Sequence, residues 1–138
     1  MRLYLIGSLR NPEVPRLAAL LRKAGHECFD DWFAAGHEAD EWWQKYEKDR
    51  GHTYTEALAG WAAQHVFTYD RHHLDRCEAV VLMLPAGKSG HLEFGYAVGR
   101  GKKGYILLDK DPERYDVMYA FATKVVDSRA QLLMELGG

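Results

Sequence analysis

The chain has 138 residues, with 18 Lys and Arg against 20 Asp and Glu, and 47% of its residues are hydrophobic. This length suits a single domain over residues 1–138, since a chain of this size buries about 68–70% of its unfolded surface. The net charge of −2 excludes the basic surface typical of nucleic-acid-binding proteins, and the apolar runs are too short to cross a bilayer. Cys28 and Cys77 form no CxxC pair, so we expect reduced thiols and a cytoplasmic location.

The first half of the chain begins with a predicted strand and helix. Residues 3–6 form a short apolar run, typical of a buried strand. Apolar residues from Val14 to Ala24 at near-helical spacing predict a helix that Gly25 ends. Residues 27–30 are predicted as a second strand. Residues 31–51 are irregular, acidic and rich in Trp, so this segment is either functional or hides a short helix.

The second half alternates helices with three more predicted strands. A helix begins after Thr53 or Thr55 and extends toward Cys77. Residues 79–84 form the clearest buried strand, which Pro85 closes. The remaining predicted elements are a helix at residues 89–99, a strand at 104–109, a short helix at 115–121, a weak strand at 123–126 and a last helix from Ser128.

Strands that alternate with helices predict an α/β fold, a Rossmann-like or flavodoxin-like three-layer sandwich with a central, mostly parallel sheet of about five strands. Ligands of such sheets bind beyond the carboxyl ends of the strands. The residues expected there are Gly7, Ser8, Leu9, Arg10, Asp30, Asp31, Pro85, Ala86, Gly87, Lys88, Ser89 and Asp109.

Two glycine-containing motifs resemble nucleotide-binding sequences but do not have the sequence context that such sites require. Residues 99–104 match G-x-G-x-x-G but follow a helix and precede a strand, which is the reverse of the dinucleotide-binding order. We therefore predict a helix end and a turn there. Gly87, Lys88 and Ser89 resemble the end of a phosphate loop, but Leu82 stands where a Walker motif needs its first glycine.

Histidines and tryptophans give weaker signals. His72 and His73 point to different faces of one predicted helix and no H-E-x-x-H is present, so we expect no metal and no cofactor. The cluster of Trp32, Trp42 and Trp43 serves either core or lid packing or, alternatively, substrate stacking.

Two carboxylates are the candidate catalytic groups. Glu93 is expected in the first turn of a helix, where the helix dipole favours an ionised carboxylate, although such residues often only stabilise helices. Gly95 and Ala97 keep its surroundings small, so that a ligand can approach closely. Asp70, near the end of the preceding helix, is expected to reach the same crevice. Two carboxylates at one crevice are the minimal equipment for cleaving a glycosidic bond.

Three blocks of sequence resemble the nucleoside 2-deoxyribosyltransferase-like family, which includes the 2′-deoxynucleoside 5′-phosphate N-hydrolases. Residues 4–10 are similar to the opening strand and Gly-Ser-Ile-Arg loop of that family, and residues 70–81 to its Asp-containing stretch before a buried strand. Residues 91–102 are similar to its Glu-x-Gly-x-Ala helix. Asn11 and Pro12 depart from the hydrolases, which have glycines there, and residues 32–51 match neither subgroup.

The resemblance implies that Glu93 is a nucleophile that forms a glycosyl-enzyme at C1′, with Asp70 as proton donor or orienting group at the base. It also implies that residues 7–10 line the base and sugar pocket, and that Ser89 holds a hydroxyl or a phosphate. Members of this family have a Rossmann-like fold and form homo-oligomers, dimers or larger, with sites near subunit interfaces.

The expected partner is a small-molecule nucleoside or nucleotide, with no nucleic-acid polymer and no membrane. The sugar is transferred to another base or to water, and both routes share the Glu93 intermediate. Arg10 and Lys88 would favour a 5′-phosphate. The alternatives are a non-catalytic nucleotide-sensing domain and a glycohydrolase of NAD-like substrates.

Overall fold

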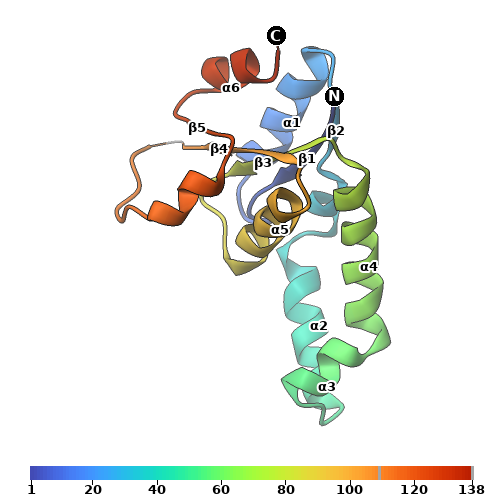
Figure 1. Cartoon of the computed structure of the whole chain (residues 1–138). Coiled ribbons are helices and arrows are strands. Elements are labelled where there is room, and N and C mark those ends of the chain that lie inside the picture. The colour runs from blue at the N-terminus through green and yellow to red at the C-terminus, as the bar shows by residue number, and fades with distance from the viewer. Residues whose placement is uncertain (109, 138) are drawn as a thin grey trace.

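The computed structural model describes residues 1–108 and 110–137, and within them five parallel strands form one sheet (Figure 1). The strands lie in the order β2-β1-β3-β4-β5. This is the flavodoxin-like order of a doubly wound sheet, and it confirms the predicted α/β fold. The strands are β1 (Arg2–Ile6), β2 (Glu27–Phe29), β3 (Ala79–Met83), β4 (Lys103–Leu107) and β5 (Lys124–Val126). Asp109, expected at the end of a strand, lies outside the described residues.

Helices cover both faces of the sheet and make it a three-layer sandwich (Figure 1). On one face, α1 (Glu13–Lys23) and α6 (Arg129–Glu135) pack against alternate strand residues such as Leu3 and Leu5. On the other face, α4 (Trp61–Arg76) and α5 (Lys88–Gly99) cover Tyr4 and Ile6. Because both faces are covered, every residue of β3 is buried, which explains its continuous apolar run.

Two glycines let α5 lie close to the sheet. A Cβ atom at Gly90 would lie 2.9 Å from Cγ2 of Ile6. A Cβ atom at Gly104, in β4, would lie 2.8 Å from the ring of Phe94. This close packing brings the middle of α5, where Glu93 stands, over the centre of β1.

Residues 31–51, expected to be functional or to hide a short helix, contain a helix that is longer than expected. The chain forms a 3-10 helix, η1 (Asp31–Ala35), and then a full helix, α2 (His37–Asp49). The pattern hid α2 because it has no side-chain cap and, of its described residues, buries Glu47 alone. The tryptophans form no single platform, since Trp32 packs between the two core layers and Trp42 is exposed.

The helix predicted after Thr53 is two helices. A capping box between Thr53 and Glu56 begins α3 (Tyr54–Ala59), and extended backbone at Gly60 separates α3 from α4. In the part of the chain that the structure describes, no helix combines the length and apolar character needed to cross a membrane.

The C-terminal predictions hold with small shifts. The short helix is a 3-10 helix, η2 (Val117–Phe121), and Ser128 caps α6 by accepting a hydrogen bond from the N–H of Gln131. Beyond the end of α5, Gly101 takes a positive φ of 85°, which confirms that residues 99–104 are a helix end and a turn.

Candidate active site

The candidate site is centred on a hydrogen bond between the sheet and α5. The hydroxyl of Tyr4, in β1, donates to Oε2 of Glu93 across 2.6 Å. Asp70, on α4, lies near enough for its charge to act on both groups. The structure therefore brings together the two predicted carboxylates, from α4 and α5, and adds a phenol from the strand beneath them.

Burial sets the proton affinities of these three groups. It raises the pKa of Glu93 to about 7, while the Tyr4 hydrogen bond lowers this pKa and the charge of Asp70 raises it. Burial also raises the pKa of Asp70. The pKa of Tyr4 is raised, first by burial and then by the charges of Glu93 and Asp70, so its hydroxyl stays protonated as a donor.

An aromatic layer separates the Tyr4 ring from solvent. The Tyr4 and Phe29 ring centroids are 5.2 Å apart, and Phe29 stacks on His73 at 3.8 Å with an interplanar angle of 10°. Tyr69 meets both Phe29 and His73 edge to face. The contact with Phe29 places an aromatic ring against the Tyr4 ring, while the Tyr4 hydroxyl meets the carboxylate of Glu93.

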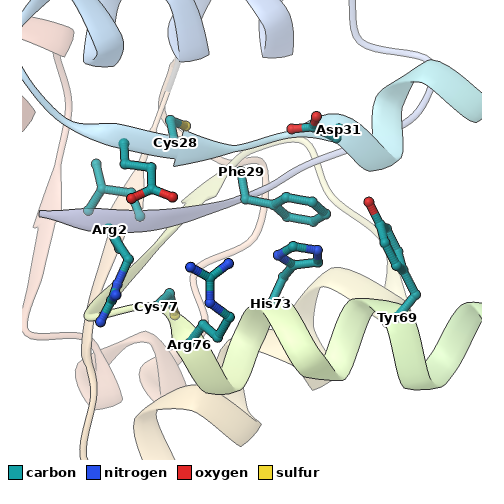
Figure 2. A pocket seen from close by; sticks show the side chains of 10 residues that line it. Arg2, Cys28, Phe29, Asp31, Tyr69, His73, Arg76 and Cys77 are labelled. Carbon is teal, nitrogen blue, oxygen red and sulfur yellow. The ribbon is translucent and has the colours of Figure 1, made fainter.

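Asp31, predicted as a binding residue, lies beside this aromatic layer. It lines a pocket of about 240 Å³ between β2 and the last turns of α4, where Figure 2 shows His73 against Phe29 with Tyr69 beside them. Tyr4, Asp70 and Glu93 do not line that pocket. The structure does not bring Asp31 together with the two carboxylates.

The two loops predicted to bind substrate follow the adjacent strands β1 and β3. Gly7, Ser8, Leu9 and Arg10 follow β1, and Gly87, Lys88 and Ser89 begin α5 after β3. Order reversal between β1 and β3 makes this carboxyl edge the usual ligand site of such a sheet.

The polar groups of these loops differ in availability. The guanidinium of Arg10 pairs with Glu41 of α2 at 2.6 Å, so a substrate phosphate would have to compete with a carboxylate. Ser8 accepts from the N–H of Arg10 through its Oγ. Lys88 and Ser89 are exposed, and Lys88 has no ion-pair partner among residues 1–108 and 110–137.

Two expectations about α5 need correction. The helix begins at Lys88, so Glu93 lies in its second turn, and burial rather than the helix dipole governs its pKa. Gly95 and Ala97 do not open a path to Glu93. Ala97 is fully buried against the sheet, and Gly95 lines a separate groove of about 400 Å³ between α5 and η2.

Sequence reasoning missed the role of Tyr4, which it treated as an apolar strand residue. The sequence feature that could have indicated this role is a tyrosine within an apolar strand, because a buried tyrosine hydroxyl usually has a hydrogen-bond partner. Only the tertiary packing shows that this partner is Glu93, 89 positions away.

The three groups can supply both parts of an acid-assisted displacement. The Tyr4 hydrogen bond stabilises the ionised Glu93, the form that acts as a nucleophile. Asp70, with its raised pKa, holds a proton more readily than an exposed aspartate and can donate it. In the described residues, no three His, Cys, Asp or Glu side chains gather closely enough to hold a metal ion.

Known structures share this fold at low sequence identity. The chain is similar to a 2-deoxyribosyltransferase from Bacillus psychrosaccharolyticus, with a TM-score of 0.65 and 14% identity over 96% of this chain and 90% of that one. A conserved protein from Enterococcus faecalis V583 gives 0.65 and 14% over 99% and 96%. A CMP N-glycosidase from Clostridium botulinum gives 0.57 and 14% over 99% and 98%. No protein-family model and no curated protein matches the sequence.

Proposed function

We propose that this chain, which shares the fold of a 2-deoxyribosyltransferase and a CMP N-glycosidase, cleaves the N-glycosidic bond of a (deoxy)nucleoside or its 5′-monophosphate. The observation that carries the proposal is the buried Glu93, held by the Tyr4 hydroxyl at 2.6 Å with Asp70 nearby. A carboxylate with a pKa of about 7 is costly to bury, and such groups cluster at functional sites.

Glu93 acts as the nucleophile in the proposed reaction. Tyr4 holds Oε2, so Oε1 is the oxygen that attacks C1′ of the sugar. The C1′–N bond breaks as the new C1′–O bond forms, and its electron pair leaves with the base. Asp70 gives a proton to the departing base or orients it. The product of this half-reaction is a glycosyl ester on Glu93.

The second half-reaction decides between a transferase and a hydrolase. We propose that the nitrogen of a second base attacks C1′ and releases Glu93, which makes the chain a nucleoside 2-deoxyribosyltransferase. The alternative is attack by water, as in a 2′-deoxynucleoside 5′-phosphate N-hydrolase. The two differ in whether water is excluded until the acceptor arrives.

The loop residues complete the proposed substrate site. Residues 7–10 would line the pocket for base and sugar, and Gly87, Lys88 and Ser89 would meet the 5′ end. Lys88 and the N-terminus of the twelve-residue α5 favour an anionic group there. Asp31, which lines a pocket without the two carboxylates, stays a prediction, as do a homo-oligomer and a cytoplasmic location.

Product analysis tests the proposal. Nucleosides, their 5′-monophosphates and NAD would each be incubated with the protein, with and without an added second base, and separated by chromatography. Glu93→Gln is the matched control because it keeps the size of the side chain and removes the nucleophile. A new nucleoside formed only with the second base supports the transferase, and free base without it supports the hydrolase.

Three results would contradict the proposal. Turnover by Glu93→Gln equal to that of the wild type would show that the reaction does not pass through a covalent intermediate on Glu93. Release of nicotinamide from NAD alone would indicate the NAD-like glycohydrolase. Tight nucleotide binding without any product would indicate a sensing domain.

A further inference from the structure

The loop between β1 and α1 lies where a doubly wound sheet usually binds phosphate. The strand order β2-β1-β3-β4-β5 reverses between β1 and β3, and in such sheets a phosphate commonly sits at the N-terminus of the helix that follows the first strand. Main-chain N–H groups that have no other partner hold the phosphate there. Whether α1 can hold a phosphate therefore depends on its free N–H groups.

The N–H groups at the start of α1 are already used within the chain. The N–H of Arg10 donates to Oγ of Ser8, and the N–H of Asn11 donates to the Ser8 carbonyl, both at 3.1 Å. Asn11 accepts in turn from the N–H of Glu13 through its side-chain oxygen, at 3.0 Å, and from the N–H of Val14 through its carbonyl, at 3.2 Å. The other two positions among residues 10–15 are prolines, which have no N–H. The first turn of α1 therefore offers a phosphate no free N–H.

The cation of this loop is engaged as well. Arg10 is the basic side chain of residues 7–10, and its guanidinium donates to Oε1 of Glu41, on α2, across 2.6 Å. Glu41 thus occupies, as a carboxylate, the position at which an anionic ligand would pair with Arg10. A phosphate placed there has to displace Glu41 and then lie beside its negative charge. Two further acidic residues, Glu38 and Asp40, stand in the first turn of α2 and add to the negative charge of this helix.

We propose that Glu41 is a specificity-determining residue, which makes the site prefer unphosphorylated nucleosides to their 5′-monophosphates. The inference rests on the proposed function, because it names the substrate class of that same site. Glu41 lies in the segment of residues 32–51, which matches neither subgroup of the family that the sequence resembles. By withholding Arg10, Glu41 leaves a 5′-phosphate without a partner on the β1 side of the site.

Lys88 does not replace the missing partner. It has no ion-pair partner in the described part of the chain, and it stands at the N-terminus of α5, after the neighbouring strand β3. A single ion pair with an exposed lysine contributes little to binding. Lys88 and the N-terminus of α5 would therefore hold a phosphate from one side only.

The Arg10–Glu41 pair is not required to hold the two segments in place. The side chains of Arg10 and Glu41 are 62% and 60% exposed, and exposed ion pairs contribute little to stability. The loop is held by its own hydrogen bonds to Ser8 and Asn11. Removing the charge of Glu41 should therefore free the Arg10 guanidinium without unfolding the loop or α2.

The ratio of two kcat/KM values tests this role. The substrates are the nucleoside that the protein cleaves fastest and its 5′-monophosphate, and we expect the wild type to favour the nucleoside. Glu41→Gln should raise the ratio of monophosphate to nucleoside about 3- to 10-fold, because it removes one exposed ion pair and one repulsive charge. Glu38→Gln is the matched control, since it removes the same charge from the first turn of the same helix and should leave the ratio near that of the wild type.

A double-mutant cycle with Arg10 tests whether Glu41 acts through this guanidinium. Arg10→Gln should lower the ratio of monophosphate to nucleoside more in the Glu41→Gln background than in the wild type, because only a free guanidinium can pair with the phosphate. An equal effect in both backgrounds would show that Glu41 does not withhold Arg10 and would overturn the proposal.

Other outcomes would also overturn the proposal. A wild type that prefers the monophosphate would do so, as would equal ratios for Glu41→Gln and Glu38→Gln. If no nucleoside or nucleotide is cleaved, the proposed function fails by itself, and equilibrium binding of deoxynucleosides and their 5′-monophosphates to the same three proteins decides about Glu41. Glu41→Gln alone should then gain affinity for the monophosphates; an unchanged affinity, or no binding of either compound, refutes the role of Glu41.

Discussion

Replacing Glu93 by Gln should stabilise the protein above neutral pH and abolish its activity. The folded state raises the pKa of Glu93 from 4.5 to about 7. The folded protein therefore binds this proton more tightly than the unfolded chain does, and stability falls as pH rises from 4.5 to 7. Above pH 7 the ionised, buried carboxylate costs about 3 kcal/mol, from ~1.4 kcal/mol per pKa unit. Gln removes this cost and preserves an acceptor for the Tyr4 hydroxyl.

Denaturant unfolding of both proteins at pH 5, 6, 7 and 8 measures the effect. The advantage of Glu93→Gln should be below about 1 kcal/mol at pH 5 and should approach about 3 kcal/mol at pH 8. The same substitution at an exposed site, Glu113→Gln, is the matched control. A Glu93→Gln difference that is flat between pH 5 and 8 would refute the assignment of Glu93 as a buried, destabilising carboxylate.

Further predictions concern the two groups beside Glu93 and the packing of α5. Tyr4→Phe removes the donor to Glu93 and should move the acid limb of the kcat/KM profile to higher pH, lowering kcat/KM at pH 7 about 10- to 100-fold; an unchanged profile contradicts this role. Asp70→Asn should slow release of the poorest leaving bases most, in turnover measured across a series of bases, whereas a uniform loss would indicate positioning alone. Gly104→Ala places a Cβ against Phe94 and should cost about 1–3 kcal/mol by denaturant unfolding. By contrast Gly95→Ala, with nothing within 4 Å, should gain up to about 1 kcal/mol, and equal effects of the two changes would argue against close packing of α5.

Elements with strong periodic patterns were predictable from local sequence. Residues 79–84 form a continuous apolar run because β3 is covered on both faces, and the spacing from Val14 to Ala24 predicts α1 because one side of that helix is buried. Helix α2 was not predictable in this way. The helix begins without a side-chain cap and buries no apolar side chain among its described residues, so neither a capping residue nor a core-facing side marked it in the sequence.

The candidate site, too, was predictable in part from local sequence and in part not. The alternation of strands and helices determined a parallel sheet, and with it the edge where the loops of Arg10 and Lys88 lie. The two carboxylates, Asp70 and Glu93, stood out in the sequence for the chemistry they can perform. Their environment did not, because a raised pKa arises from desolvation, and desolvation depends on which distant segments pack together.

The sequence by itself thus determined the three-layer α/β architecture, the parallel direction of the strands and the two candidate catalytic carboxylates of this protein. Only the tertiary structure decided that Tyr4 holds Glu93, that Asp31 lines a pocket apart from Glu93, and that α2 and α3 extend away from the sheet (Figure 1). The physical reason is the sequence distance over which the interactions act. Hydrophobic periodicity shows which side of a local segment is buried. The hydrogen bond between Tyr4 and Glu93 joins residues 89 positions apart, so it forms only when the whole chain packs, and the same packing decides which surfaces stay exposed.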